Sequence, residues 1–322
     1  RPSKVVDTVG RCCAVVRGGD GRILWTLPEE GRVQCMDAWS NVIEWTADGC
    51  GAPYAAAVVP LEAYSRVWVL DTKGGRILLL NAATGCHESE IPDPEEPDRS
   101  KFEFRELPLA KPHGITAWMD ANEESIQVWV ADTGNSRLVG FDNETGEALE
   151  AFGEDILDEP RGVQAVDAQR LASICRRGGH IFGRGGELLC RFNFHLMLPT
   201  AITLDNRGAG GVLVVVDEYT ERILIFCART GEHMRTLGDT GFSMGTGIHK
   251  GVAFVEGFDG YGCKLFIADD RNQRVCSVEV GPQSKPPTPY VPVAPANSQG
   301  LDAPASAGGR RERLRKPMPE VN

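Results

Sequence analysis

Four acid–base pairs recur along the chain at one spacing, an aspartate followed five residues later by an arginine. They are Asp71 with Arg76, Asp132 with Arg137, Asp217 with Arg222, and Asp269 with Arg274. A carboxylate and a guanidinium in such close sequence can form charge-assisted hydrogen bonds, and the carboxylate can also accept from the loop amides between them. A β-branched or aromatic run precedes each aspartate, so we interpret each pair as closing a hairpin loop of four residues, which is a structural role.

The other residue types that could support catalysis or bind a metal do not occur in the arrangements that such sites require. Residues 241–245 read GFSMG and match the GxSxG nucleophile pattern by letters, but that motif needs a strand before the serine and a helix after it, so we interpret the segment as a loop. The ten cysteines include no CxxC pair, which disfavours structural zinc. No glycine-rich phosphate loop opens a helix. We therefore expect neither a metal nor a cofactor.

The hairpins belong to larger units. Two more hairpins fit the spacing without the aspartate, at residues 27–32 and 175–180, and in the second of these His180 takes the place of the arginine. Another apolar run precedes each hairpin, and a further strand follows, most clearly at 148–153 and 233–238. Six such four-stranded units with no convincing helix between them predict an all-β fold, a six-bladed β-propeller with four-stranded antiparallel blades over residues 1–280.

The ring of blades also needs a closing strand. The last unit turns proline-rich after its third strand, whereas residues 5–10, VVDTVG, look like the fourth strands of other units. We expect this N-terminal strand to pair into the last blade and close the ring.

The pattern PHGITA followed by VWVADTGNSRL, in residues 112–153, resembles the NHL repeat, and residues 249–276 fit it nearly as well. The match is weaker at 53–82 and 199–227, and the units at 11–47 and 160–193 are degenerate. The resemblance implies a six-bladed propeller and several functional classes: protein-interaction domains, RNA-binding domains, and amidating lyases that bind zinc through histidines at Pro-His positions. Only Pro112-His113 has that last form here, so lyase chemistry of this kind is not expected.

The first strand of each blade should line the central channel, so residues at one offset in the six blades should surround one mouth. We place six residues at this mouth: Arg11, Tyr54, His113, Arg161, Thr200 and Lys250. Three of them are permanent cations, which on an acidic protein predicts a ligand site for an anion: a carboxylate, a phosphate or an acidic side chain of a partner. Alternatively, these side chains extend into solvent or pair with acids such as Asp120 and Asp205.

Composition narrows the range of partners. The formal net charge is −11 over 322 residues, which disfavours general nucleic-acid binding. No apolar run reaches the roughly 18 residues of a membrane helix, so no membrane partner is expected. Residues 88–107 are predicted to form a charged surface loop, and residues 281–322 a proline-rich, disordered tail that contains the basic cluster GRRERLRKP.

The compartment is left undetermined. Cysteines scattered through a chain of this length more often serve as small buried apolar residues than as disulfides, which slightly favours a reducing compartment. The glycosylation sequon at Asn143 falls on a predicted turn, where it would be accessible, and therefore keeps secretion open.

These features predict a non-catalytic binding or scaffold propeller that engages a protein partner through loops on one face, with an anion site at the channel mouth. The alternative is a hydrolase- or lyase-type propeller enzyme that acts on a small molecule at the same mouth. RNA binding is a third hypothesis, and it would require the basic ring to extend across a face.

Overall fold

A computed structural model gives the arrangement of the chain. It describes residues 3–8, 10–18, 21–60, 65–91, 109–119, 125–207, 210–237, 249–256 and 263–279. Three segments discussed above lie outside the described residues: the tail at 281–322, residues 92–107 of the predicted charged loop, and the GFSMG segment at 241–245. Residues 88–91 belong to a strand and not to a loop.

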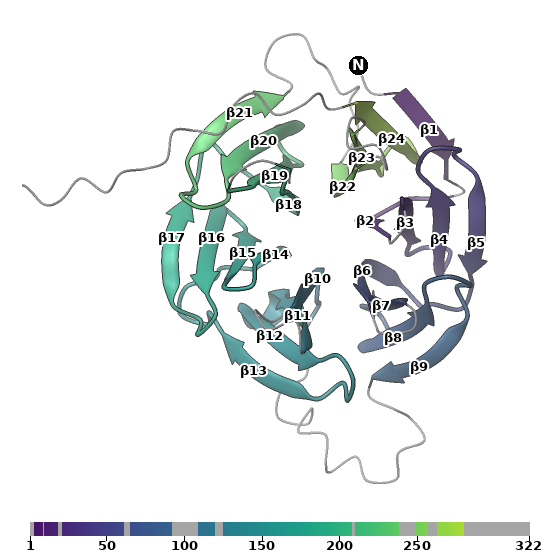
Figure 1. Cartoon of the computed structure of the whole chain (residues 1–322), viewed down its shortest axis with the longest axis horizontal. Coiled ribbons are helices and arrows are strands. Elements are labelled where there is room, and N and C mark those ends of the chain that lie inside the picture. The colour runs from purple at the N-terminus through teal and green to yellow at the C-terminus, as the bar shows by residue number, and fades with distance from the viewer. Residues whose placement is uncertain are drawn as a thin grey trace, which may run out of the picture. The chain divides into compact units, whose positions relative to one another are not determined.

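The described residues form six antiparallel sheets of four strands, arranged as blades around a ring (Figure 1). The sequence-based prediction of a six-bladed propeller is therefore confirmed. Blade one contains β2 (Val15–Arg17), β3 (Arg22–Leu27), β4 (Arg32–Asp37) and β5 (Ile43–Ala47). Blade two contains β6 (Pro53–Pro60), β7 (Ser65–Asp71), β8 (Arg76–Asn81) and β9 (His87–Ile91). Blade three contains β10 (Gly114–Met119), β11 (Ile126–Asp132), β12 (Arg137–Asp142) and β13 (Ala148–Phe152).

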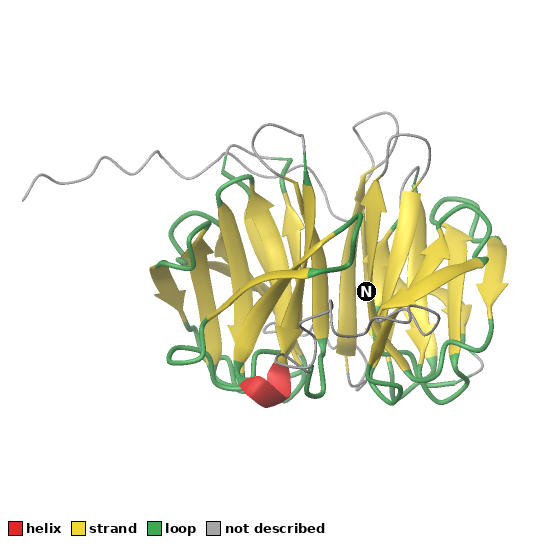
Figure 2. Ribbon diagram, turned by 90° about the horizontal axis from the view of Figure 1, so that it is seen from below, coloured by secondary structure: helices red, strands yellow, loops and turns green. Residues whose placement is uncertain are grey.

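The second half of the ring repeats this plan. Blade four contains β14 (Gly162–Asp167), β15 (Arg170–Cys175), β16 (Gly178–Gly183) and β17 (Leu188–Phe192). Blade five contains β18 (Pro199–Asp205), β19 (Val212–Asp217), β20 (Arg222–Cys227) and β21 (His233–Leu237). Blade six contains β22 (His249–Glu256), β23 (Cys263–Asp269), β24 (Arg274–Glu279) and β1 (Ser3–Asp7). A short 3₁₀ turn follows β11 and is visible in the edge-on view (Figure 2).

The N-terminal strand closes the ring, as the sequence predicted. β1 pairs antiparallel with β24, with Ser3 opposite Ser277 and Asp7 opposite Arg274 (Figure 1). The amide of Thr8 continues the contact by donating to the carbonyl of Gln273 at 2.8 Å. Blade six is thus built from both ends of the ring-forming chain.

The hydrophobic core lies between neighbouring blades. Trp68 of blade two packs in one cluster with Phe141 of blade three, and Trp25 of blade one shares another with Phe266 of blade six. All four side chains are fully buried. Burying a large apolar side chain is worth roughly 1.5–3 kcal/mol, so each sheet is stabilised mainly by the flat faces of its two neighbours.

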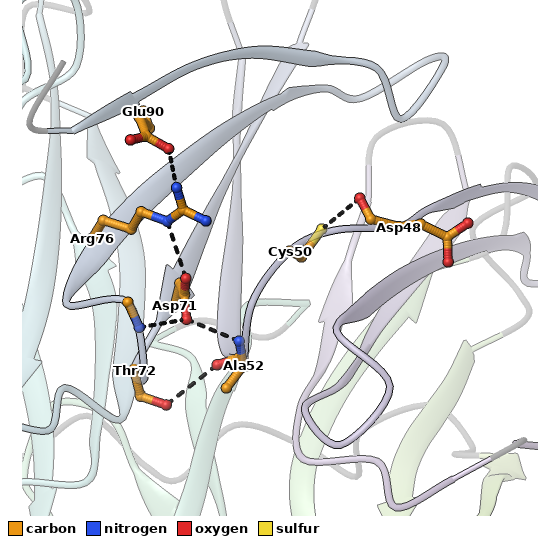
Figure 3. A network of polar contacts seen from close by, with 8 residues as sticks. Asp48, Cys50, Ala52, Asp71, Thr72, Arg76 and Glu90 are labelled. Carbon is orange, nitrogen blue, oxygen red and sulfur yellow. Dashed lines mark hydrogen bonds and ion pairs between the residues drawn. The ribbon is translucent and has the colours of Figure 1, made fainter. Parts of the chain in front are cut away.

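The hairpins between the second and third strands all lie on one face, since these strands run antiparallel to the first. We call this the hairpin face. In blade two, Asp71 accepts hydrogen bonds from the amides of Ala52 and Gly74, both at 2.9 Å, and from Arg76 Nε at 3.1 Å (Figure 3). Burial alone would raise the pKa of Asp71, but these amide and guanidinium donors outweigh it and hold the pKa below its usual value.

The other aspartates make similar contacts. Arg137 Nε lies 2.9 Å from Asp132 Oδ2, with side chains 9% and 0% exposed, and Arg274 Nε lies 2.7 Å from Asp269 Oδ2. In blade five, Asp217 faces Arg222 in register and accepts from the amides of Met197, Leu198 and Thr220.

Blade four departs from the predicted register. Cys175 is paired with Gly178, so its hairpin loop holds only Arg176 and Arg177, and His180 lies opposite Ser173 instead of at the arginine position. The imidazole of His180 still reaches the thiol, with Nδ1 3.5 Å from Cys175 Sγ. The hairpin is therefore two residues shorter than the spacing suggested.

The sequon prediction is wrong on accessibility. Asn143 is only 4% exposed, and its Oδ1 accepts a hydrogen bond from Trp68 Nε1 at 3.1 Å. The turn that carries it packs against blade two, so its amide nitrogen is not presented to solvent.

None of the ten cysteines forms a disulfide, and all ten lie in described segments. Of the described helical residues, none belongs to a helix long and apolar enough to cross a membrane.

Candidate functional site

The first strands of the six blades enclose a channel cavity of about 340 Å³. Its walls are small and apolar, mainly Ala, Gly, Val and Ile from the inner strands. Two glycines show why: a Cβ on Gly114 would lie 2.7 Å from Gly162 Cα, and a Cβ on Gly251 would lie 2.4 Å from the amide nitrogen of Val15. At these two positions, only a residue without a side chain allows the neighbouring strands to approach this closely.

Polar side chains gather where these strands begin, on the hairpin face. In blade two, Pro53 lies opposite Asp71 and Ala55 opposite Leu70, so Tyr54 is an extra, bulged residue. Thr200 and Lys250 occupy the same bulge in blades five and six. A bulge turns its side chain away from the regular alternation of the strand.

Two further residues take the equivalent position without a strand assignment. The amide of His113 donates to the carbonyl of Ala131, and the amide of Arg161 donates to that of Ile174, at 3.2 and 2.8 Å. Tyr54, His113, Arg161 and Thr200 all line the cavity, and we call these four the channel-mouth residues. The side chain of Lys250 lies outside the described part of the chain.

Arg11, expected at this mouth, lies elsewhere. In blade one it is the amide of Cys13 that donates to the second strand, at Thr26, and Cys13 lines the cavity. The guanidinium of Arg11 is instead bound by the buried Asp270, with Nη2 2.7 Å from Oδ2 and Nε 3.1 Å from Oδ1. Blade one begins with Cys12-Cys13-Ala14 in place of the Pro-x-Gly pattern, so its offset was set two residues too early.

Tyr54 and His113 form a stacked pair at the mouth, with ring centroids 4.5 Å apart and planes inclined by 25°. Burial raises the pKa of Tyr54 to about 12; Cys13 and Glu218 act in the same direction, and Arg161 opposes them. The phenol is therefore neutral at physiological pH and keeps a hydroxyl that can donate a hydrogen bond.

Arg161 is the cation of the channel-mouth residues. Its Nη2 lies 3.4 Å from Glu159 Oε2, a long contact, and its side chain is 22% exposed. Its Nε is buried and has no hydrogen-bond partner in the described structure. Leaving such a donor unsatisfied costs about 1–3 kcal/mol, which an acceptor from a ligand could recover.

Together these groups could bind an anion. The mouth presents a phenol, a guanidinium and the Thr200 hydroxyl, all of which can donate hydrogen bonds to a carboxylate or phosphate. The described residues contain no group of three or more His, Cys, Asp and Glu side chains that could hold a metal ion.

Sequence reasoning missed three residues near this site. Cys13 was hidden by the degenerate start of blade one, and Asp270 and Glu218 both directly follow the hairpin aspartate of their blades. The tandem acids Asp269-Asp270 and the Asp217-Glu218 pair were the available signals, because a residue after the second strand lies on the hairpin face.

Comparison with known proteins identifies the fold of the chain but does not assign the chain to a family. No family model matches the chain, and no curated protein matches it either. Solved structures do match. A streptogramin B lyase has a TM-score of 0.57 at 14% identity, covering 86% of this chain and 96% of the other.

Two further structures differ widely in described role. A catalytically inactive virginiamycin B lyase from Staphylococcus aureus with quinupristin has a TM-score of 0.56 at 11% identity, covering 87% of this chain and 98% of that one. The Cps50 (Swd1) propeller domain from Myceliophteria thermophila has a TM-score of 0.58 at 11% identity, covering 87% and 100%. Identities this low show a shared fold only.

Proposed function

We propose that this chain is a binding propeller of NHL type, which engages a protein partner through the hairpin face and receives an anionic group at the channel mouth. The anion is a carboxylate, supplied by a side chain of the partner or by a small acid. The observation behind this proposal is Arg161, a residue of the cavity lining whose buried Nε has no hydrogen-bond partner among the described residues.

The surroundings of Arg161 support a carboxylate. Tyr54 keeps its hydroxyl proton at neutral pH, and Thr200 supplies a second hydroxyl at the same mouth. Arg11 contributes nothing here, because Asp270 already binds it. Among the four channel-mouth residues, the proposed site therefore depends on the guanidinium of Arg161 and the neighbouring hydroxyls of Tyr54 and Thr200.

The test is thermal stabilisation by small anions. Succinate, glutarate and inorganic phosphate would be titrated into the protein while the unfolding temperature is followed, because a ligand of the native state raises Tm with concentration. We expect stabilisation by the dicarboxylates, and we expect Arg161→Ala to abolish it. Arg271→Ala, which removes an exposed arginine from the blade-six hairpin, is the matched control and should retain it. An Arg161→Ala response equal to that of the unmodified protein would refute the site.

A second candidate is an enzyme that acts on a small molecule at the same mouth. The stacked Tyr54–His113 pair beside Cys13 offers groups for proton transfer, and two proteins of similar fold are named as lyases. Incubation with quinupristin, followed by mass spectrometry, tests this directly. Turnover that disappears in His113→Ala would favour the enzyme, and intact quinupristin after prolonged incubation would count against it.

A further inference from the structure

Exposed apolar side chains gather at the junction of blades four and five. Phe194 and Met197, 40% and 54% exposed, belong to the connection between β17 and β18, and Tyr219, 72% exposed, lies in the hairpin between β19 and β20. Isolated exposed apolar residues are ordinary, but neighbouring ones on a single connection and its adjacent hairpin suggest an interaction surface.

Hydrogen bonds hold this connection on both sides. Asn193 Nδ2 donates to the carbonyl of Arg177 in the blade-four hairpin at 2.6 Å. The amides of Met197 and Leu198 donate to Asp217 Oδ2 at 2.6 and 2.9 Å, and the amide of Glu218 donates to the carbonyl of Leu198 at 2.9 Å. The two hairpins and the connection between them therefore form one continuous surface.

Phe194 is fixed in place although it is exposed. Its ring lies parallel to that of His233 on β21, with centroids 3.6 Å apart and planes inclined by 6°, and His195 contacts it edge-on at 4.9 Å. His233 is held in turn by a contact of 2.8 Å between its Nε2 and Thr236 Oγ1. An aromatic side chain that is already ordered loses little conformational entropy on binding, which is typical of an interface anchor.

Cations flank this aromatic platform. Arg176 and Arg177 form the tip of the shortened blade-four hairpin, and Arg191 lies on β17. All three are exposed, and their guanidinium groups make no hydrogen bond or ion pair with any described residue. By contrast, the hairpin arginines Arg76 and Arg137 are bound to aspartates of their own blades. The opposite end of the surface is acidic, with Glu218 and Glu221 beside Tyr219.

We propose that this surface, which we call the four–five seam, docks a linear segment of a protein partner that carries acidic residues next to a large apolar residue. The seam comprises Arg176, Arg177, Arg191, Phe194, Met197 and Tyr219. The acidic residues of the partner face the blade-four arginines, and its apolar residue packs on Phe194 and Met197. This inference rests on the proposed protein-binding function but uses none of the channel-mouth residues.

Charge and composition favour a peptide over RNA at the seam. Arginine with Phe, Met and Tyr is the composition enriched at protein interfaces. A single-stranded RNA would need a positive groove along its backbone, and Glu218 and Glu221 interrupt such a path.

A peptide-display experiment tests the proposal with random peptides as the probe. A phage library of random 12-residue peptides would be selected on the folded protein, and enriched peptides would be synthesised with a fluorescent label for anisotropy titration. We expect enrichment of Asp and Glu around an aromatic or aliphatic residue.

Arg177→Glu and Phe194→Ser should each weaken binding at least tenfold, while Arg271→Glu, the same charge change in the blade-six hairpin, should stay within twofold. Circular dichroism melting would establish that every variant is folded.

Three outcomes would refute the proposal of peptide docking at the four–five seam. The selected peptides could lack enrichment of acidic residues next to an apolar residue, or they could bind Arg177→Glu as tightly as the unmodified protein. The third outcome is that a labelled oligouridine binds through Arg177 while no peptide does. The variants distinguish the two proposals. Arg161→Ala should leave peptide affinity at the seam unchanged, and Arg177→Glu should leave stabilisation by dicarboxylates unchanged. If the unmodified protein binds peptides at the seam but is not stabilised by dicarboxylates, only the channel-mouth proposal fails; if it is stabilised by dicarboxylates but binds no peptide at the seam, only the seam proposal fails.

Discussion

Blades three and four are neighbours built on the same four-stranded plan, yet they close their central hairpins with different chemistry. Blade three uses a buried ion pair, Asp132 with Arg137, around a loop of four residues. Blade four uses a thiol and an imidazole, Cys175 with His180, around a loop of two. The first pair is charged and the second is neutral, although Asp132 and Cys175 both lie at the end of a second strand on the hairpin face.

The difference follows from what each loop must connect. Asp132 accepts from Arg137, from the side-chain amide of Asn135 and from the amide of Ala110, which leads into the blade. A carboxylate can hold all of these donors at once, whereas a thiol cannot. The two-residue loop of blade four offers fewer donors, so a neutral pair suffices there. Its arginines, Arg176 and Arg177, are then not needed to close the hairpin.

Burial keeps the blade-four pair neutral. It lowers the pKa of His180 to about 4, with a smaller contribution of the same sign from Arg191, and it raises the pKa of Cys175 to about 12. A thiol with so high a pKa is a poor nucleophile at neutral pH, which argues for a structural role of the pair.

The largest effect on stability is expected for Asp132→Ala, which removes the carboxylate from the charged hairpin closure of blade three. This change leaves the guanidinium of Arg137 buried without its carboxylate and removes the acceptor for Ala110 and Asn135. Breaking a buried pair from one side typically costs about 3–5 kcal/mol, and we expect a loss of that size in the free energy of unfolding. Urea denaturation followed by tryptophan fluorescence would measure it. A loss below about 1 kcal/mol would mean that the ion pair does not stabilise the blade.

His180→Phe tests the neutral closure of blade four through the pH dependence of the free energy of unfolding. The native pKa of His180 lies below its unfolded value, so the unfolded chain takes up the proton first. The stabilisation is fully present above about pH 6.5 and is lost as the pH falls towards about 4. We expect at most about 3 kcal/mol of pH-dependent stability in this window, absent from the Phe variant. The observable is the difference between the two stability curves, in which carboxylate titration cancels. A flat difference would show that the imidazole is not desolvated in the fold.

The smallest effect is expected for Cys175→Ala. The thiol is buried and neutral, so its removal leaves no unpaired charge and costs about 1 kcal/mol through lost packing and the contact with His180. The equivalent position in blade three should cost several times more. Parallel urea titrations of the two variants would measure the ratio, and equal losses would contradict the distinction between charged and neutral closures.

The sequence was sufficient to predict the ring because the relevant signals are local. The Asp-to-Arg spacing marks the central hairpin of a blade in a single stretch, and residues 5–10 resemble a fourth strand wherever they lie in the chain. These patterns survive because every blade must bury the same two faces against its neighbours. Closure by β1 was predictable for the same reason.

The site was harder to predict because its residues lie where the pattern fails. Arg11 was predicted to lie at the channel mouth from its offset in the repeat unit. The equivalent position in blade one belongs to Cys13, and no proline in the sequence marks it. His180 was aligned with the arginines because a four-residue loop was assumed. Asn143 follows a strand on a turn and gives no sign in sequence that Trp68 of the neighbouring blade will cover it. Contacts between blades have no fixed sequence spacing.

The pairing of β1 with β24 has a consequence for the order of events in folding. Ser3 meets Ser277, so the contact that completes blade six joins residues almost as far apart in the chain as the propeller allows. Loop-closure entropy must be overcome before such a contact contributes stability, and folds dominated by distant contacts form slowly. During synthesis the first strand of the propeller therefore waits for the last, while five blades can form from neighbouring segments. Until β24 arrives, the edge of β1 that will pair with it remains available for mispairing, which makes the final step the one most exposed to aggregation.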